Sequence, residues 1–354
     1  MAVYINGLGI ISPQPAIEQA FSFSENEHLK NKGFLKCIEP DYKNYINPSL
    51  LRRMSRIIKM GVASAQICLN DAGIKMPDAI ITGTGLGCIE DTEKFLTNIF
   101  EGNEALLAPT SFIQSTHNTV GGQIALLLGC HHYNFTYVHR GFSFESALLD
   151  AMMILKEKNG ENILVGGTDE LTPNSYTIME RLGLYKSFQD PESNILQTQT
   201  NGSLAGEGST FFLIASEKTE NTYAEIKGLK TFYKPSGEEE IKKNISDFLA
   251  ENNLSEKEIG LVILGFSGDK EKDHIYQSLS EHTFNQNSIA YFKHLSGEYH
   301  TATAFALWLA AEIIKTGNIP EDILTKQKTE STKHILIYNH YENINHSLYL
   351  LSKC

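Results

Sequence analysis

Residues 137–148 read YVHRGFSFESAL, a turn between one apolar stretch typical of a strand and another typical of a helix. Such turns often carry a nucleophile, because the helix N-terminus offers free N–H groups and a positive dipole to a developing anion. No cysteine stands in this turn, and its only serine, Ser143, has no recognisable base near it in the sequence. The stretch is therefore either the nucleophile turn of an enzyme or the remnant of one.

The segments on either side of this turn alternate between strand-like and helix-like patterns. Apolar runs predict strands at Val3–Ile11, Ala79–Gly83, Phe135–Val138, Ile163–Gly166, Thr210–Ala215, Gly260–Leu264, Ile335–Tyr338 and Ser347–Leu351. Helical spacing of apolar residues predicts helices at Arg52–Ala72, Asp91–Phe100, Gly121–Leu128, Glu145–Lys158, Glu238–Glu251, Asp269–Leu279 and Ala302–Lys315. Strands that are apolar throughout are typical of a sheet buried on both faces, so we predict a layered α/β fold.

The chain also divides into two halves with a similar order of elements. Residues 217–258 are more polar and form a connector, and no obvious sequence repeat relates the halves. We predict an N-terminal half over residues 1–216 and a C-terminal half over residues 217–354.

Composition excludes several classes of function. The 354 residues are 41% hydrophobic with a net charge of −12, and the absence of a prominent Lys/Arg run argues against a nucleic-acid partner. The five cysteines are scattered and form no CxxC pair, which favours reduced thiols in the cytoplasm over disulfides or a zinc site. The N-terminus lacks the basic region of a signal peptide, and no apolar run reaches the ~18 residues that span a membrane. We expect a cytoplasmic protein without a metal or cofactor.

Four polar or glycine-rich motifs are candidates for a functional site. TGTGLGC at residues 82–88 has Cys88 where a dinucleotide loop has its last glycine, so a simple glycine turn is the better interpretation. His131 and His132 are sequence neighbours and would point apart in an extended chain. Residues 115–118 (STHN) precede Gly121-Gly122 and shape either a helix cap, a pocket or a subunit interface. In residues 292–308, Lys293 and Glu298 form either a buried pair or part of a helix cap.

Six stretches, taken in order, resemble the β-ketoacyl–acyl-carrier-protein synthases, or ketosynthases. They are AVYINGLGIISP, RRMSRIIKMGVASAQICLNDAGI, PTSFIQSTHNTVGGQIALLLG, LKEKNGENILVGGTDE, LAGEGSTFFLIAS and FKHLSGEY with the later GNIPE. Each motif is weak, but the ordered set spans nearly the whole chain. The resemblance implies the thiolase-like fold, which has two similar α/β halves in five layers (α-β-α-β-α).

The same resemblance places the family's catalytic positions. A gapless count back from Gly166-Gly167 puts the nucleophilic cysteine at Gly141. The first catalytic histidine falls on Leu264, and the second falls on Glu298, after Lys293 and Gly297. The family's glycine-rich gating loop corresponds to residues 341–344 (YENI), which contain no glycine. No catalytic residue is therefore expected to be intact.

These departures imply a chain-length-factor-like subunit, although the best-known chain length factors have glutamine where this sequence has Gly141. Such a subunit pairs with an active ketosynthase, meets an acyl carrier protein, and shapes the acyl tunnel in type II fatty acid, polyketide or polyene (for example aryl polyene) biosynthesis. The resemblance places a dimer interface near Ser111–Leu128, where we expect Ser115, His117, Asn118, Gly121 and Gly122 to contribute. We expect this interface to be large, apolar and above ~2,000 Å².

Two alternatives remain open at this point. One is an enzyme with a rebuilt acyl-transfer site, in which Ser143 is the nucleophile and His139, Lys293, Glu298 and His300 assist it. The other is a homodimer that binds a ligand or carrier protein without turnover. We also expect Gly141, at the start of the predicted helix Phe142–Lys158, to lie near Lys293 and Glu298.

Overall fold

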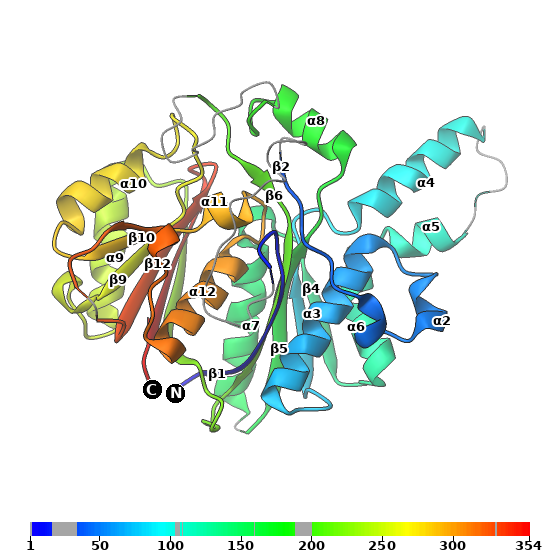
Figure 1. The fold of residues 1–354 in the computed structure, drawn as a ribbon, viewed down its shortest axis with the longest axis horizontal. Helices are drawn as coiled ribbons and strands as arrows, with labels where there is room; N and C mark the ends of the chain where they lie inside the picture. Colours follow the sequence, from blue (N-terminus) through cyan, green and yellow to red (C-terminus); the bar gives the residue numbers. More distant parts are fainter. Residues whose placement is uncertain are drawn as a thin grey trace.

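The computed structural model describes residues 2–15, 34–102, 107, 109–158, 160–187, 200–329 and 331–354. Its main feature is a sheet with the strand order β11-β10-β9-β12-β13-β8-β1-β7-β5-β3-β4 (Figure 1). A pair of short strands, β2 (Phe34–Leu35) and β6 (Ala205–Gly206), stands apart from it.

The two halves of the sheet repeat one topology. The N-terminal strands are β1 (Tyr4–Ile11), β3 (Ala79–Gly83), β4 (Tyr133–Tyr137), β5 (Asn162–Asp169) and β7 (Gly208–Ala215). Their C-terminal counterparts are β8 (Ala224–Tyr233), β9 (Leu261–Leu264), β10 (Ser288–Tyr291), β12 (His334–Tyr341) and β13 (Asn345–Ser352). In both halves the second, third and fourth strands run parallel, and the fifth runs antiparallel between the first and the fourth. The first strands meet at the seam, where Tyr4 pairs with Glu225.

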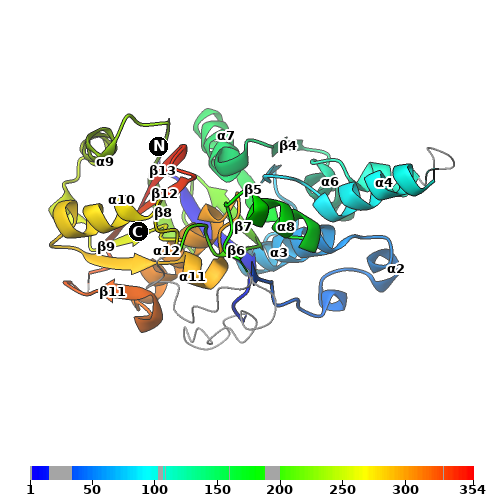
Figure 2. The same ribbon diagram turned by 90° about the horizontal axis from the view of Figure 1, so that it is seen from above.

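Helices complete five layers, and three hydrophobic clusters hold these layers together. The outer N-terminal layer contains α3 (Arg56–Ala72) and α6 (Thr119–Leu128), the middle layer α7 (Ser143–Glu157) and α12 (Thr303–Thr316), and the outer C-terminal layer α9 (Glu238–Glu251) and α10 (His274–Ser278). Figure 2 shows the outer layers at opposite ends of the molecule, with α12 and the strands between them. The predicted thiolase-like fold is confirmed.

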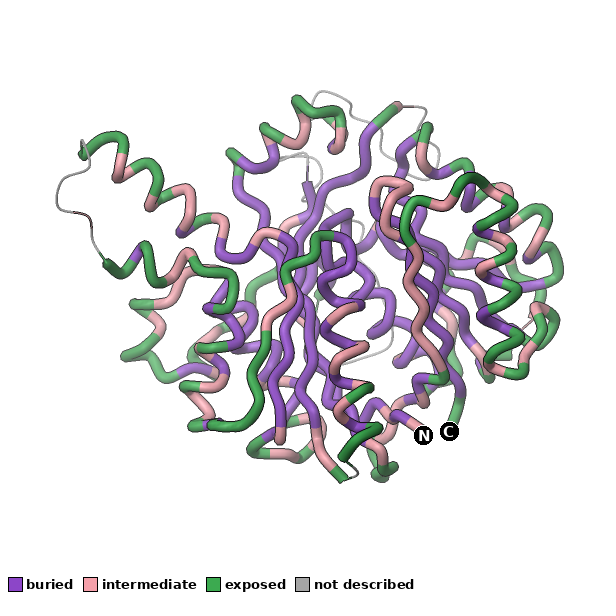
Figure 3. The backbone as a smooth tube through the Cα atoms, turned by 180° about the vertical axis from the view of Figure 1, so that it is seen from behind, coloured by how far each residue is buried: buried purple, intermediate pink, exposed green. Residues whose placement is uncertain are grey.

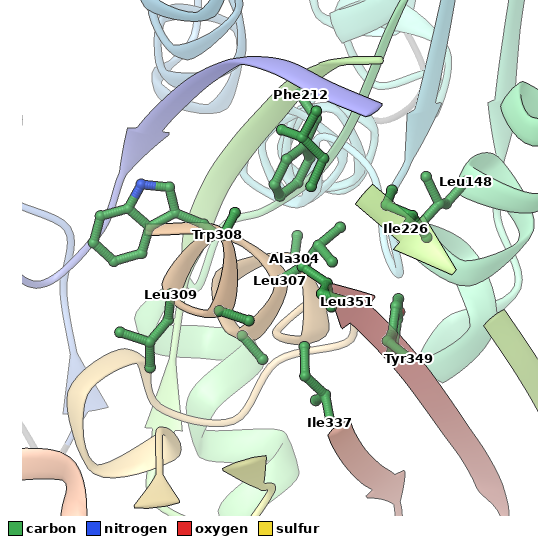
Figure 4. Packing of buried hydrophobic residues seen from close by; sticks show 14 of the residues in the cluster. Leu148, Phe212, Ile226, Ala304, Leu307, Trp308, Leu309, Ile337, Tyr349 and Leu351 are labelled. Carbon is green, nitrogen blue, oxygen red and sulfur yellow. The ribbon is translucent and has the colours of Figure 1, made fainter. Parts of the chain in front are cut away.

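The middle layer is the deepest part of the molecule. Helix α12 is buried on almost every side, as expected for a helix that is apolar around its whole circumference. Its residues Ala304, Leu307 and Trp308 pack between strands of both halves, beside Phe212 of β7 and Tyr349 of β13 (Figure 4). Figure 3 shows the same gradient, with buried strands inside and exposed outer helices.

The remaining elements are short or lie outside the five layers. They are α2 (Pro48–Leu51), α4 (Ile89–Glu101), α5 (Pro109–Gln114), α8 (Pro173–Arg181), α11 (Lys293–Ser296), β11 (Leu324–Lys326), the 3₁₀ turns Tyr42–Asn44, Arg140–Phe142, Glu256–Glu258 and Glu321–Ile323, and a π turn at Leu279–Thr283. Two of these elements, α11 and the turn Arg140–Phe142, are largely buried. Helices α4 and α5 project from the body as an arm (Figure 1).

Several predicted boundaries need correction. The helix predicted from Arg52 begins at Arg56, because a short separate helix, α2, ends at Leu51 and Ser55 adopts the extended conformation of an N-cap. The helix predicted over Asp269–Leu279 is reduced to His274–Ser278. Strand β8 lies within the stretch interpreted as a connector. Most of its residues are half-buried, and its sequence lacks the continuous apolar run from which the other strands were predicted. The domain boundary at residue 216 stays a prediction.

Candidate functional site

The turn at residues 137–148 has the predicted strand-to-helix form. Strand β4 ends at Tyr137, a 3₁₀ turn covers Arg140–Phe142, and α7 starts at Ser143. Arg140 has a φ of 48°, a left-handed conformation that few non-glycine residues adopt. The turn is thus as tight as a nucleophile turn, but its central residue is glycine.

Gly141 lies against a side chain from the other half of the chain. A Cβ atom added to Gly141 would stand 2.6 Å from the Cβ of Tyr341 and 3.0 Å from its Cγ. Real Cβ atoms do not approach a neighbour this closely, so any side chain at position 141 requires Tyr341 to move. The place of the expected nucleophile is therefore filled by Tyr341.

A β-hairpin positions Tyr341. Tyr341 ends β12, and the two residues after it, Glu342 and Asn343, both have positive φ, at 59° and 51°. Positive φ at both central residues is typical of a type I′ turn, and the Ile344 N–H closes this turn onto the Tyr341 oxygen at 3.0 Å within a three-residue loop. Lys272 holds this turn through an ion pair with Glu342 at 2.5 Å.

His300 lies on the other side of Tyr341. The two rings lie 4.8 Å apart, and the pKa of His300 is lowered because the ring is buried. Asp169 fixes the backbone beside it by accepting hydrogen bonds from the N–H and hydroxyl of Thr301, at 3.0 and 2.8 Å, and from the N–H of Gly85. His300 is thus a buried packing partner of Tyr341.

Lys293 and Glu298 form a buried ion pair. The Lys293 Nζ lies 2.5 Å from Glu298 Oε2 and also donates to the backbone oxygen of His340 at 3.3 Å. Burial raises the pKa of Glu298 to about 7, and the Lys293 charge opposes that shift. Since Lys293 reaches the backbone one residue before Tyr341, the pair lies beneath the residue that fills the Gly141 position.

Gly141, His300, Lys293 and Glu298 are thus linked through the hairpin that carries Tyr341. Leu264 does not belong to this group. Its side chain packs in the outer core with α9 and α10, because it points to the opposite face of the sheet from Ile263. An added Cβ at the next residue, Gly265, would lie 2.1 Å from Asn339 Oδ1 and 2.8 Å from the hydroxyl of Tyr276. The placement of the first histidine at Leu264 stays a prediction.

The hydroxyl of Ser143 has a structural role. Ser143 Oγ accepts a hydrogen bond from the His139 N–H at 2.8 Å and donates one to the Arg140 oxygen at 2.7 Å. Ser143 is fully buried, whereas His139 is exposed and its ring stacks edge-on against Phe142. Both hydrogen bonds of the Ser143 hydroxyl therefore join backbone groups, and neither involves a basic side chain.

The predicted interface residues differ in their exposure. His117, Asn118 and Gly122 are exposed and Ser115 is half-buried, but Gly121 is buried. An added Cβ at Gly121 would lie 3.1 Å from Thr82 Oγ1, and its carbonyl accepts from Asn134 of β4. Gly121 thus allows α6 to pack closely on the sheet, and it does not lie on the surface.

The glycine turn at residues 82–88 forms no catalytic group among the described residues. Cys88 is buried, and burial raises the pKa of its thiol. Across the described residues, no group of three or more His, Cys, Asp or Glu side chains is arranged to hold a metal ion. No helix in this part of the chain is both long and apolar enough to cross a membrane.

Sequence analysis missed one charged surface. From residue 42 to residue 70 the chain contains no Asp or Glu but five basic residues, Lys43, Arg52, Arg53, Arg56 and Lys59. Arg56 is used internally, because its guanidinium binds the buried carboxylate of Glu207. Lys43, Arg52 and Arg53 are exposed. The sequence indicates this surface by the lack of acidic residues between positions 42 and 70, and not by a run of basic residues.

Comparison with known proteins agrees with the fold. Residues 35–189 match the family model "Beta-ketoacyl synthase, N-terminal domain". The resemblance to the ketosynthases is confirmed. No protein of curated function matches this ketosynthase-like chain significantly in sequence.

Solved structures share the fold over the whole length. The ishigamide ketosynthase/chain length factor superposes with a TM-score of 0.80 at 16% identity, covering 100% of this chain and 99% of that one. A β-ketoacyl synthase from Burkholderia phymatum gives 0.79 at 15% identity, with 100% and 99% covered. The ketosynthase ApeO in complex with its chain length factor ApeC, from Xenorhabdus doucetiae, gives 0.75 at 15% identity, with 100% and 98% covered.

Proposed function

We propose that this chain is a non-catalytic, chain-length-factor-like subunit that pairs with an active ketosynthase. The observation that carries the proposal is the contact between Gly141 and Tyr341. Condensation by a ketosynthase needs a nucleophile that carries the acyl group, and a glycine packed against an aromatic ring has no group to acylate.

The buried ion pair supports the same proposal. A developing oxyanion needs hydrogen-bond donors placed around it. Here the carboxylate of Glu298 takes the place of one donor, and Lys293, the nearest cation, is already bound to that carboxylate. The group of side chains is therefore suited to hold the hairpin in place and unsuited to stabilise negative charge.

The proposed partner is an active ketosynthase in type II fatty acid, polyketide or polyene biosynthesis. Two of the solved structures with this fold contain a ketosynthase together with a chain length factor. In the proposed pair the ketosynthase holds the growing acyl chain, and this subunit shapes the end of the tunnel at the interface.

An acyl carrier protein is the second proposed partner. Carrier proteins are acidic, so one that delivers substrate to the pair needs a basic surface. The exposed residues Lys43, Arg52 and Arg53 provide basic groups for such a surface, although the net charge of the whole chain is −12. Such a surface raises the association rate and makes binding sensitive to salt.

Intact-protein mass spectrometry tests the absence of acylation. The purified chain, incubated alone with acyl and malonyl carrier protein, is expected to show no acyl adduct and no ketoacyl product. Gly141→Cys should not restore turnover, because Leu264 and Glu298 remain where the family has its two histidines. An acyl adduct mapped to Ser143 or Cys88 of the wild-type chain would overturn the proposal and favour a rebuilt acyl-transfer site.

A further inference from the structure

A groove of about 230 Å³ opens on the outer N-terminal layer. Its walls are α3, α6 and residues 45–50, which include the start of α2 (Figure 1). Helices α3 and α6 cover the face of the sheet that carries Ile80, whereas α7 packs on the opposite face, which carries Ile81. The groove is therefore separate from Gly141 at the start of α7.

The floor of this groove is apolar and recessed. Helix α3 presents apolar residues at helical spacing, and the small side chain of Ala65 leaves a depression between larger neighbours. The rim residues Asn47 and Leu50 are exposed, whereas the floor is buried. Because the floor lies below its rim, the groove fits a thin hydrocarbon chain better than the broad side of a helix. The buried floor residues are Ile46, Val62, Ala65, Leu69 and Ile124.

The volume of the groove sets the length of such a chain. An apolar cavity of about 150 Å³ holds benzene, which is roughly 25 Å³ for each carbon atom. At the same packing, the 230 Å³ of this groove corresponds to about nine carbons. Each methylene group that leaves water for an apolar surface strengthens binding by about fourfold.

Two basic residues lie beside the lining of the groove. Arg53 follows Asn47 and Leu50 at intervals of three residues, and its N–H donates to the Leu50 oxygen at 3.0 Å, which continues the helical turn. Lys59 precedes Val62 of α3 by three residues, so both residues lie on the same face of that helix. Among the described residues neither Arg53 nor Lys59 has an ion pair.

No acidic side chain lines the groove in the part of the chain that the structure describes. Residues 42–70 contain no Asp or Glu, and α6 has none either. Just before this stretch, Asp41 accepts a hydrogen bond from the N–H of Lys43 and caps a 3₁₀ turn. Just after it, Asp71 is directed to the sheet, where it accepts from the N–H of Leu8 at 2.9 Å. The groove thus combines an apolar floor with uncompensated cations.

We propose that this groove binds a saturated carboxylate of about nine carbons, with its chain on the floor and its carboxylate beside Arg53 and Lys59. An amphipathic anion suits both features, because its hydrocarbon chain leaves water and its carboxylate meets charged donors. The inference goes beyond the proposed function, since it assigns a small-molecule site to the outer layer.

NMR titration of the methyl-labelled full chain with sodium nonanoate tests the inference. Saturable shifts are expected at the methyl groups of Val62, Leu69 and Leu127, which line the groove. The affinity should rise about fourfold for each methylene from heptanoate to nonanoate, and it should rise no further at undecanoate, because the added carbons stay in water.

Variants separate the contribution of the charge from that of the chain. The double variant Arg53→Gln, Lys59→Gln is expected to weaken nonanoate binding about fivefold and to leave the binding of uncharged nonan-1-ol unchanged. Lys243→Gln, on the exposed side of α9, is the matched control and should change neither affinity. Gln66→Phe, which fills the groove from its rim, should weaken both ligands about tenfold.

A second blocking variant guards against misfolding of the first. Leu50→Glu, at an exposed position, places a carboxylate at the rim and should weaken nonanoate more than nonan-1-ol. Circular dichroism and thermal unfolding check that every variant is folded.

Three results would overturn the inference. They are the absence of saturable nonanoate binding, shifts confined to methyl groups outside the groove, and equal effects of Lys243→Gln and the double variant. The first of these would leave the groove as a seat for an apolar side chain of a partner protein. The titrations use the chain alone, without ketosynthase or carrier protein, so their outcome is independent of the acylation result.

Discussion

Gly141 and Tyr341 fit together because only glycine leaves room for the ring. Tyr341 packs between this glycine and the ring of His300, and its backbone neighbour is held by Lys293. The predicted nucleophile position therefore coincides with a packing contact. A side chain introduced at this position disturbs the contact.

Gly141→Cys is expected to lower the free energy of unfolding by about 1–3 kcal/mol, because the new Cβ overlaps Tyr341. Urea denaturation measures the change. Gly122→Ala is the matched control, since nothing lies within 4 Å of its Cβ and alanine favours the helix by up to about 1 kcal/mol. In a Tyr341→Gly background, which removes the Cβ that lies 2.6 Å from the added atom, the cysteine should cost less. An equal cost in both backgrounds would contradict the contact.

Glu170 makes the free energy of unfolding depend on pH. Burial raises the pKa of Glu170 from 4.5 to about 8 in the folded chain. Its protonated form is stabilised by folding, so this contribution is fully present below pH 4.5 and is lost as the pH rises through about 8.

Glu170→Gln should therefore flatten the fall in unfolding free energy between pH 5 and pH 8, by about 1–3 kcal/mol. Glutamine keeps the acceptor for the N–H of Glu90. Urea titrations at the two pH values provide the measurement, with Glu251→Gln at the exposed end of α9 as control. Parallel pH profiles for wild type and Glu170→Gln would show that Glu170 is not the titrating group.

At the scale of elements, the β12–β13 hairpin determines where Tyr341 lies. Eight residue pairs run from His334–Ser352 to Tyr341–Asn345, and the turn forces two non-glycine residues into positive φ. The pairing leaves three residues in the loop, and the first two adopt the positive φ of a type I′ turn, which matches the twist of the paired strands. The strain at Glu342 and Asn343 is offset by this pairing.

Asn343→Gly should raise the free energy of unfolding by up to about 1 kcal/mol, since glycine adopts positive φ without a steric penalty. Asn343→Val should lower it by about 1 kcal/mol or more, because a β-branched side chain fits this conformation poorly. Thermal unfolding compares the two. If both variants shift the midpoint in the same direction, the turn is not of the assigned type.

At the scale of the whole molecule, the two halves of the sheet share a topology but not their surroundings. The C-terminal edge is covered by β11, whereas no strand among the described residues covers the N-terminal edge, which is apolar. The predicted interface segment Ser111–Leu128 lies beside this open edge and exposes Phe112, Ile113 and Leu126. The size of the interface stays a prediction.

The basic surface on the same half yields a prediction for the carrier protein. The double variant Arg52→Glu, Arg53→Glu is expected to weaken carrier-protein binding about tenfold at low salt, with a smaller effect at high salt. Isothermal titration calorimetry measures the affinity of the carrier protein for the ketosynthase pair that contains the wild-type chain and for the pair that contains the double variant. The control reverses two exposed lysines of the opposite outer layer, Lys243 and Lys257. Equal weakening by both double variants would indicate a general charge effect.

The sequence by itself determined the type of most elements and the lack of a side chain at the centre of the turn. Strands such as Ala79–Gly83 and helices such as Glu238–Glu251 have the predicted bounds, because their apolar periodicity is a local property. The absence of a side chain at Gly141 is also local, once the resemblance places it in the turn.

Only the tertiary structure decided what occupies the site. That Tyr341 fills the Gly141 position, that Leu264 faces the outer core, and that β8 joins the two halves all depend on pairings between residues far apart in the sequence. A strand's register decides which face each residue meets, and a shift of one residue reverses it. Periodicity within one segment carries no information about its register against another, so these features could not be read from the sequence.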